Sequence, residues 1–332
     1  MTGTFYEVFE NGREEVTLSS QKKTTFCASY LEVRMFNVGS GEAILLTLPG
    51  RKSAWVIDCG CHHNEALGEA LAGYLNDEGI KLKGIVLSHP HFDHGGAIET
   101  LVQKAPLAST VTYCRSRDEY FWPPKPWIKT LNTELNAMNA ALKKIVVEQN
   151  GMERVDLGKG VQARMYSGKR VSGGYTAIFM HVRYKAARLL FTGDVSCGYE
   201  EKLLKDSLGY EFRADVLKVT HHGSSSGTSN KLVCAVDPGI AIASTGHDAG
   251  HRLERGPLKR LGGRPGDREV LETRVDGDII LQTDGSSSKG RVLYYVDKED
   301  PGRFAAAAEA KTVALDSINR ASGGPAGCGK DC

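Results

Sequence analysis

The amino-acid sequence predicts a layered α/β fold, because short apolar segments alternate with a segment of helical periodicity. Three apolar segments separated by glycine-containing turns come first and predict strands, at residues 31–38, 43–48 and 54–58. Residues 64–78 then carry apolar side chains at helical spacing and stop at Gly79, which is typical of an amphipathic helix. Residues 84–88 predict another strand, and the order strand, helix, strand favours stacked sheets and helices.

The rest of the chain is less regular. Residues 111–114 predict a strand, and the three prolines within 121–127 exclude both a helix interior and a central strand there. Residues 130–148 have apolar side chains at helical spacing, so we expect a long helix. Further strands are expected at residues 177–182, 188–191, 215–219, 240–243, 278–281 and 292–296, and a short one near the start at residues 5–9.

Composition places the chain among ordinary globular proteins. Lys and Arg total 42 against 40 Asp and Glu, and 41% of the 332 residues are hydrophobic, which excludes disordered, collagenous and fibrous classes. A net charge of +2 argues against a protein that binds polyanions through bulk charge. Without repeats or a break in composition, we expect one domain at 29–299, a polar extension at 1–28 and a tail at 300–332.

Targeting signals are not visible in the sequence. No apolar run approaches the roughly 18 residues that a membrane span needs, which excludes a transmembrane channel or pump. The first ten residues have neither a basic region nor an apolar core, so we expect a cytoplasmic protein with reduced thiols.

The strongest chemical signal is the segment Ser88–His94, SHPHFDH. Three imidazoles and one carboxylate lie within six residues, directly after an apolar strand. His89 with His91 suits one metal ion, and Asp93 with His94 can face a second. Neutral imidazole and carboxylate are ligands for Zn²⁺, Mn²⁺ or Fe. A polar loop that is rich in histidine by chance explains one or two such residues better than four in this spacing.

Two later segments repeat this layout, an apolar strand that ends in a metal-ligand type of residue. Asp194 follows the first of them, where its two oxygens could bridge two ions, and His221 and His222 follow the second. Each signal is weak alone, since Thr-Gly-Asp is common in turns and paired histidines are usually solvated. Together with the first cluster they predict a site for two metal ions.

The order of these motifs resembles the metallo-β-lactamase-fold hydrolases, and more narrowly the soluble hydrolase domain of the DNA-uptake competence protein ComEC. The segments that carry the resemblance are residues 36–45, 56–60, 216–224 and 246–251, and the similarity extends from about Leu31 to Asp284. It implies that residues 29–299 form a hydrolase domain of this fold. The fold is a four-layer αβ/βα sandwich of two mixed sheets flanked by helices, with the metals at one edge.

The resemblance also implies a ligand set for two divalent ions, Zn²⁺ first, with Mn²⁺ or Fe as alternatives. The implied ligands are His89 and His91 for metal 1, Asp93 and His94 for metal 2, and Asp194 as a bridge. Either His221 or His222 completes metal 2, and we prefer His221 because it directly continues the strand. A further metal-1 histidine found in many members is absent here, which predicts that metal 1 is weakly held, completed by water, or absent in the purified protein.

The activity that this resemblance implies is a metal-dependent phosphodiesterase or nuclease with a metal-bridging hydroxide as nucleophile. Asp93 would orient that nucleophile, and His251 is the candidate proton donor for the leaving oxygen. Asp58 is expected to orient a ligand histidine rather than to bind metal.

Candidate substrate-binding residues follow from a basic segment at 249–268, which holds Arg252 and Arg255, and from the hydroxyl of Ser224. The alternatives are an exposed loop histidine at 251, a solvated basic loop and a simple serine turn. The expected substrate is a phosphodiester, with nucleic acid as one class, and a protein partner is compatible with the sequence. Two other functions remain open: a carbonyl ester, lactone or thioester hydrolase, and a non-catalytic metal-binding partner protein.

Overall fold

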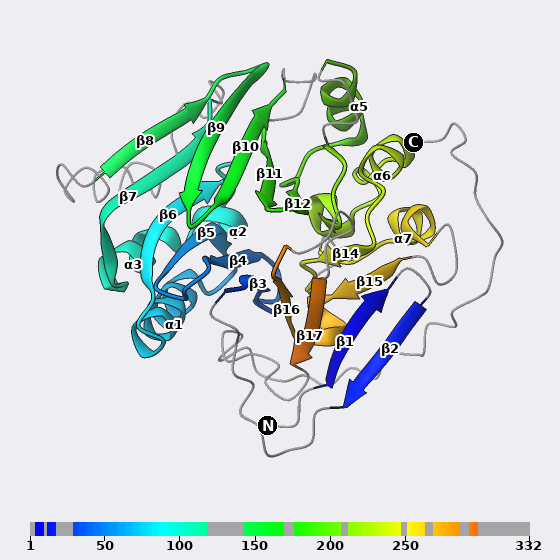
Figure 1. Cartoon of the computed structure of the whole chain (residues 1–332). Coiled ribbons are helices and arrows are strands. Elements are labelled where there is room, and N and C mark those ends of the chain that lie inside the picture. Colours follow the sequence, from blue (N-terminus) through cyan, green and yellow to red (C-terminus); the bar gives the residue numbers. More distant parts are fainter. Residues whose placement is uncertain are drawn as a thin grey trace.

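The computed structural model describes residues 4–9, 12–17, 29–117, 142–168, 176–206, 212–246, 251–262, 268–285 and 292–297. Two mixed sheets face each other, and helices cover the outer face of each (Figure 1). The α/β sandwich expected from the sequence is therefore confirmed.

The larger sheet has ten strands and contains the first chemical motif at the end of one of them. In spatial order the strands are β2 (Gly12–Thr17), β1 (Thr4–Phe9), β17 (Val292–Asp297), β16 (Asp278–Thr283), β3 (Leu31–Met35), β4 (Glu42–Thr47), β5 (Ser53–Gly60), β6 (Lys81–Leu87), β7 (Leu107–Ser116) and β8 (Leu142–Val147). Pairing is parallel from β5 to β8 and antiparallel elsewhere.

The smaller sheet has seven strands and contains the two later motifs. In spatial order they are β15 (Glu269–Glu272), β14 (Ile240–Ala243), β13 (Val216–Lys218), β12 (Ala187–Phe191), β11 (Ile178–Tyr184), β10 (Val161–Ser167) and β9 (Gly151–Gly158). Strands β12 to β15 pair in parallel, so their carboxyl ends lie along one edge.

Three apolar clusters hold the layers together. One lies between the sheets, where Trp55 also donates a 3.1 Å hydrogen bond from Nε1 to the carbonyl of Leu157 on the opposite sheet. A second joins the larger sheet to α1 (Asn64–Asp77) and α3 (Ile98–Lys104). The third joins the smaller sheet to α5 (Cys197–Asp206), α6 (Asn230–Val236) and α7 (Arg255–Leu261). The short helices α2 (Phe92–Gly95), η3 (Thr220–Gly223) and α8 (Thr273–Asp276) lie in connections between strands.

Most expected elements are present, with one clear error. The helix at 64–78 is α1, and the expected strand at 5–9 is β1. Residues 142–147, expected to end a long helix, form β8 instead and pair with β7. The apolar spacing of this segment fits a helix. However, its residues 145–147 are all β-branched, and β7 offers backbone hydrogen-bonding partners beside it.

Other expectations concern parts of the chain that are not described. The proline-rich segment at 121–127, residues 130–141 of the expected helix and the tail at 300–332 lie outside the described residues. Within the expected extension at 1–28, β1 and β2 pair with each other, and β1 pairs with β17, which continues the larger sheet. In the described residues, we find no helix that combines the length and the apolarity needed to cross a bilayer.

Candidate metal centre

The predicted motifs meet at one edge of the sandwich, where strands of both sheets end. From the larger sheet, β6 leads into the segment that contains His89 and His94. From the smaller sheet, β12 leads to Asp194 and β13 to His222. Carboxyl ends of parallel strands are the usual place for ligand-binding side chains in α/β proteins.

The turn that carries His94 is pressed directly onto β5. A Cβ atom at Gly60 would lie 2.5 Å from the carbonyl carbon of Asp93 and 2.6 Å from the backbone nitrogen of His94. Only glycine allows this approach. The backbone nitrogen of Ala97 also donates to the carbonyl of Cys59 at 3.0 Å. The ligand turn is therefore fixed to a buried strand.

Asp58, at the end of β5, orients the imidazole of His94. Its Oδ1 accepts from the backbone nitrogen of Ser88 at 2.7 Å, and its Oδ2 accepts from the Ser88 hydroxyl at 2.6 Å. The Nδ1 atom of His94 lies 2.9 Å from the same Oδ2. Because an ionised carboxylate only accepts, Nδ1 of His94 keeps its proton, and Nε2 is the nitrogen that can bind an ion once its own proton is displaced.

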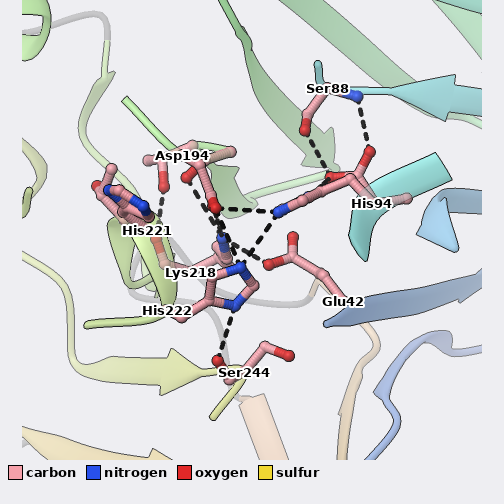
Figure 2. Close-up of polar contacts among 12 residues, drawn as sticks. Glu42, Ser88, His94, Asp194, Lys218, His221, His222 and Ser244 are labelled. Atoms are coloured by element: carbon pink, nitrogen blue, oxygen red, sulfur yellow. Dashed lines mark hydrogen bonds and ion pairs between the residues drawn. The ribbon is translucent and has the colours of Figure 1, made fainter. Parts of the chain in front are cut away.

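Three buried side chains converge on one point (Figure 2). The Nε2 atoms of His94 and His222 are each 3.0 Å from Oδ2 of Asp194 and 3.2 Å from each other. His222 donates from Nδ1 to the carbonyl of Ser244 at 3.0 Å, so Nε2 is the nitrogen that can bind an ion once its own proton is displaced.

The structure brings His222, and not His221, into this cluster. Both residues have left-handed backbone conformations, with φ of 52° and 51°, so the chain turns sharply after β13. His221 turns away from the centre, and its Nδ1 lies 3.0 Å from the hydroxyl of Ser226 (Figure 2). The geometry favours His222, the alternative, over the preferred His221 as the candidate ligand, because the left-handed turn after β13 ends the strand continuity on which that preference rested.

A second group of donors adjoins the first and includes the expected proton donor. Oδ2 of Asp93 lies 3.2 Å from Nε2 of His251 and 3.6 Å from Nε2 of His222. The side chains of Asp93 and His251 are 30% and 18% exposed, so this group forms the solvent side of the site. Asp93, His222 and His251 can bring their ligand atoms within 4.8 Å of one another.

The expected metal-1 ligands lie beside the cluster rather than within it. The ring of His89 is buried, with its centroid 4.2 Å from that of His94 and 4.5 Å from that of His91. Among the described residues, neither His89 nor His91 belongs to a group of three donors whose ligand atoms lie within 4.8 Å of one another.

Two charged residues at the centre were not predicted. Lys218 and Glu42 are fully buried, and the Lys218 ammonium lies 2.6 Å from Oε2 of Glu42 and 3.3 Å from Oδ1 of Asp194. The sequence did contain a signal: a lysine inside the apolar strand 216–219 needs a buried partner, and buried lysines are almost always paired.

Residues 37–247 match the metallo-beta-lactamase superfamily. The chain belongs to this superfamily. ComE operon protein 3 of Bacillus subtilis is 24% identical over 265 residues, which cover 75% of this chain and 32% of that protein. Recombination protein 2 of Haemophilus influenzae is 24% identical over 227 residues, 65% of this chain and 24% of that protein. The chain thus spans a third or less of these relatives, and the predicted resemblance is confirmed.

Comparison with solved structures adds little beyond the superfamily. Human tRNase Z, short form, superposes with a TM-score of 0.38 and 15% identity, covering 63% of this chain and 91% of that one. A similarity at this level carries no argument about activity.

The donor set of this superfamily member fits a divalent ion. Two imidazole nitrogens and a carboxylate oxygen already share one point, and Glu42, His94, Asp194 and His222 can all bring a ligand atom within 4.8 Å of one another. Imidazole and carboxylate bind Zn²⁺, and also Fe and Mn²⁺. Superfamily members typically bind divalent metals, and this chain has the side chains to do so.

The charges around the cluster favour protonated His94 and His222 at the position where a metal ion would bind. Burial lowers the pKa of His222, but Asp194 and Asp93 outweigh burial and raise it to about 9. Burial also opposes a charged His94, yet Asp194 and Asp58 hold its pKa well above the ordinary value. Burial raises the pKa of Asp194, and the neighbouring histidines and Lys218 bring it well below its usual range. A metal ion must displace protons to bind.

Of the expected substrate-binding residues, Arg252 directly follows His251 in the chain, Arg255 is the first residue of α7, and Ser224 directly follows η3. Arg252 and Arg255 are exposed, and the hydroxyl of Ser224 lies 3.0 Å from that of Ser226. Part of the basic segment is structural, since Arg260 donates to the carbonyls of Thr228 and Gly227 at 2.6 and 2.9 Å.

Proposed function

We propose that the chain is a metal-dependent hydrolase of phosphodiester bonds, with nucleic acid as its substrate class. The observation that carries this proposal is the buried cluster of His94, Asp194 and His222 with Asp93 and His251 on its solvent side. Buried ligands hold an ion, and partly exposed acid–base groups beside it serve chemistry on a substrate.

In this proposal the buried residues bind the metal ion and orient its imidazole ligands. His94, Asp194 and His222 would hold one divalent ion, Zn²⁺ first, with Mn²⁺ or Fe as alternatives. When bound, such an ion lowers the pKa of water and polarises a phosphoryl oxygen. Asp58 and the carbonyl of Ser244 keep the two imidazoles in the tautomer that binds metal. His89 and His91, with Asp194, would hold a second ion less firmly.

In this proposal the residues on the solvent side orient the attacking water and donate a proton to the leaving oxygen. The sequence offered Asp93 both as a ligand of the metal ion and as an orienting group, and its Oδ2 lies 3.9 and 3.6 Å from the Nε2 atoms of His94 and His222. We assign it the second role, in which it would accept a hydrogen bond from the attacking water and so orient it. His251 is 3.2 Å from Asp93, which keeps its ring at the mouth of the site and supports donation of a proton to the leaving oxygen. A phosphodiester has a poor leaving group, so this proton matters.

The substrate class rests on charge and on relatives. Arg252 and Arg255 are exposed residues one and four positions after His251 in the chain, and guanidinium binds phosphate through paired hydrogen bonds. Ser224 would add a hydroxyl donor. One relative is named Recombination protein 2, and recombination acts on DNA, which favours a nucleic acid over a small ester.

The test compares hydrolysis of bis-p-nitrophenyl phosphate and of a labelled single-stranded DNA. The protein is stripped of metal and reloaded with Zn²⁺ or Mn²⁺. We expect metal-dependent cleavage that Asp194→Ala abolishes and that His221→Ala, the matched control outside the cluster, retains. Metal binding without cleavage of either substrate would contradict the proposal and favour ester or thioester hydrolysis.

The basic residues are tested separately. Changing Arg252 and Arg255 together to Ala should lower turnover of DNA on the order of tenfold or more while metal content stays the same. Unchanged turnover would show that these side chains are only a solvated surface.

A further inference from the structure

The ammonium of Lys218 lies at the centre of the site and contacts three oxygen atoms, one through an ion pair and two through hydrogen bonds. These are Oε2 of Glu42 at 2.6 Å, Oδ1 of Asp194 at 3.3 Å and the carbonyl of Gly193 at 3.3 Å. Lys218 ends β13 in the smaller sheet, whereas Glu42 begins β4 in the larger one. The ion pair therefore joins the two sheets across the site (Figure 2).

The two oxygens of Asp194 consequently have different partners. Oδ1 faces Lys218, while Oδ2 faces the Nε2 atoms of both His94 and His222 at 3.0 Å. The sequence alone allowed both oxygens to bridge metals. In the structure one oxygen is available to a cation, and the other is held by an ammonium.

Glu42 is a carboxylate that could bind metal but is held by Lys218. Its ligand atom lies within 4.8 Å of those of His94, Asp194 and His222. Two imidazoles and two carboxylates would close a tetrahedral site with four protein ligands, which is the arrangement of structural zinc. A catalytic site instead has three protein ligands and one position open to water or substrate.

We propose that Lys218 is a positioning residue that keeps this metal centre open. It restricts Asp194 to one ligand oxygen and holds Glu42 out of the coordination sphere, so that three protein ligands remain around the ion. This inference rests on the proposed metal-dependent function but concerns the number of ligands rather than the substrate.

Replacing Lys218 with Met removes the competing ammonium and leaves Glu42 without its partner. Glu42 then becomes the fourth ligand, and the repulsion between Lys218 and the ion is lost as well. We expect Zn²⁺ to bind at least about tenfold more tightly, because the positive charge of Lys218 repels the positively charged ion, and such repulsion is costly in a buried site. Hydrolysis should fall, because the open position is filled.

The experiment compares wild type, Lys218→Met, and the double variant Glu42→Gln/Lys218→Met. Zn²⁺ affinity is measured by competition with a chelating dye, and the visible absorption of the Co²⁺-loaded protein reports coordination number and ligand type. We expect the single variant alone to show a changed Co²⁺ spectrum. The double variant should return to the wild-type spectrum, because the amide that replaces Glu42 cannot supply a carboxylate.

A separate variant covers the case in which Lys218→Met fails to fold, since it leaves an unpaired buried charge. In Glu42→Gln with Lys218 intact, we expect the wild-type Co²⁺ spectrum, because Glu42 does not bind the ion. A changed spectrum there would show that Glu42 is already a ligand and would overturn the inference.

The remaining outcomes separate this inference from the proposed function. If wild type binds Co²⁺ and Lys218→Met gives the same spectrum and the same Zn²⁺ affinity, the positioning role is refuted while metal-dependent hydrolysis stands. If wild type binds neither Zn²⁺ nor Co²⁺, the proposed function fails, and the inference fails with it.

Discussion

Replacing Asp58 with Asn tests how the buried hydrogen bonds prepare His94 for metal. The carboxylate accepts three hydrogen bonds, from the backbone nitrogen and hydroxyl of Ser88 and from Nδ1 of His94. An amide of the same shape retains one acceptor oxygen and places an NH₂ group where Oδ2 was. That group donates to Nδ1 of His94, so the imidazole proton moves to Nε2 and faces Asp194.

A protonated Nε2 cannot bind a metal, so each binding event must first reverse the tautomer. Loss of an outer-shell partner typically costs about 10- to 100-fold in metal affinity. We therefore expect Zn²⁺ affinity to fall by about 1.4 to 2.7 kcal/mol. The fall should approach the upper end, because the same Oδ2 also accepts from the Ser88 hydroxyl and both bonds are lost together.

The assay is competition for Zn²⁺ between the protein and a chelating dye, at a pH where the variant is folded. Asp215→Asn is the matched control, because Asp215 accepts a 2.8 Å hydrogen bond from the backbone of Arg188 and contacts no histidine of the cluster. Zn²⁺ affinity in Asp58→Asn within twofold of wild type would refute the orienting role. An equal loss in Asp215→Asn would assign the effect to general destabilisation.

Four further predictions concern the cluster and the core. His222→Ala should remove the bound metal, whereas His221→Ala should retain it, and metal analysis after dialysis distinguishes the two. Because the pKa of His222 is raised to about 9 and that of His94 is raised as well, metal affinity should rise with pH up to that value by at least about tenfold per unit. The stability that protonated His222 gives the metal-free chain is full below pH 6.5 and is lost as pH rises through 9, which thermal unfolding with a chelator can follow. Gly84→Ala would press a Cβ atom into the ring of Trp55 and should cost about 1–3 kcal/mol in urea unfolding. Gly73→Ala, in open space on α1, should stabilise by about 0.5–1 kcal/mol, and equal effects would contradict this packing argument.

The sequence predicts best what is local along the chain. The candidate ligands within residues 89–94 could be proposed because they lie close together in the sequence, and α1 could be predicted because its apolar stripe is long. The choice between His221 and His222 could not be made, since it depends on a left-handed turn that no residue preference dictates. The pairing of Lys218 with Glu42 depends on how two sheets pack, which a pattern along one strand does not contain.

The helix expected at 130–148 fails for a related reason in the part that is described. The apolar residues at 142 and 145 are compatible with a helix and equally with an edge strand. Only the presence of β7 as a hydrogen-bonding neighbour decides between them. Tertiary pairing here overrides the local pattern.

The candidate metal ligands come from both sheets, so the metal site forms only when the two sheets have packed together. His94 follows a strand of the larger sheet, and Asp194 and His222 follow strands of the smaller one, so neither half alone presents the three donors. A bound ion would act as a staple between the halves and would stabilise the docked sandwich in proportion to its concentration. Separation of the sheets and release of the ion should then be a single cooperative event, and the chain should acquire its chemistry only at the last step of folding.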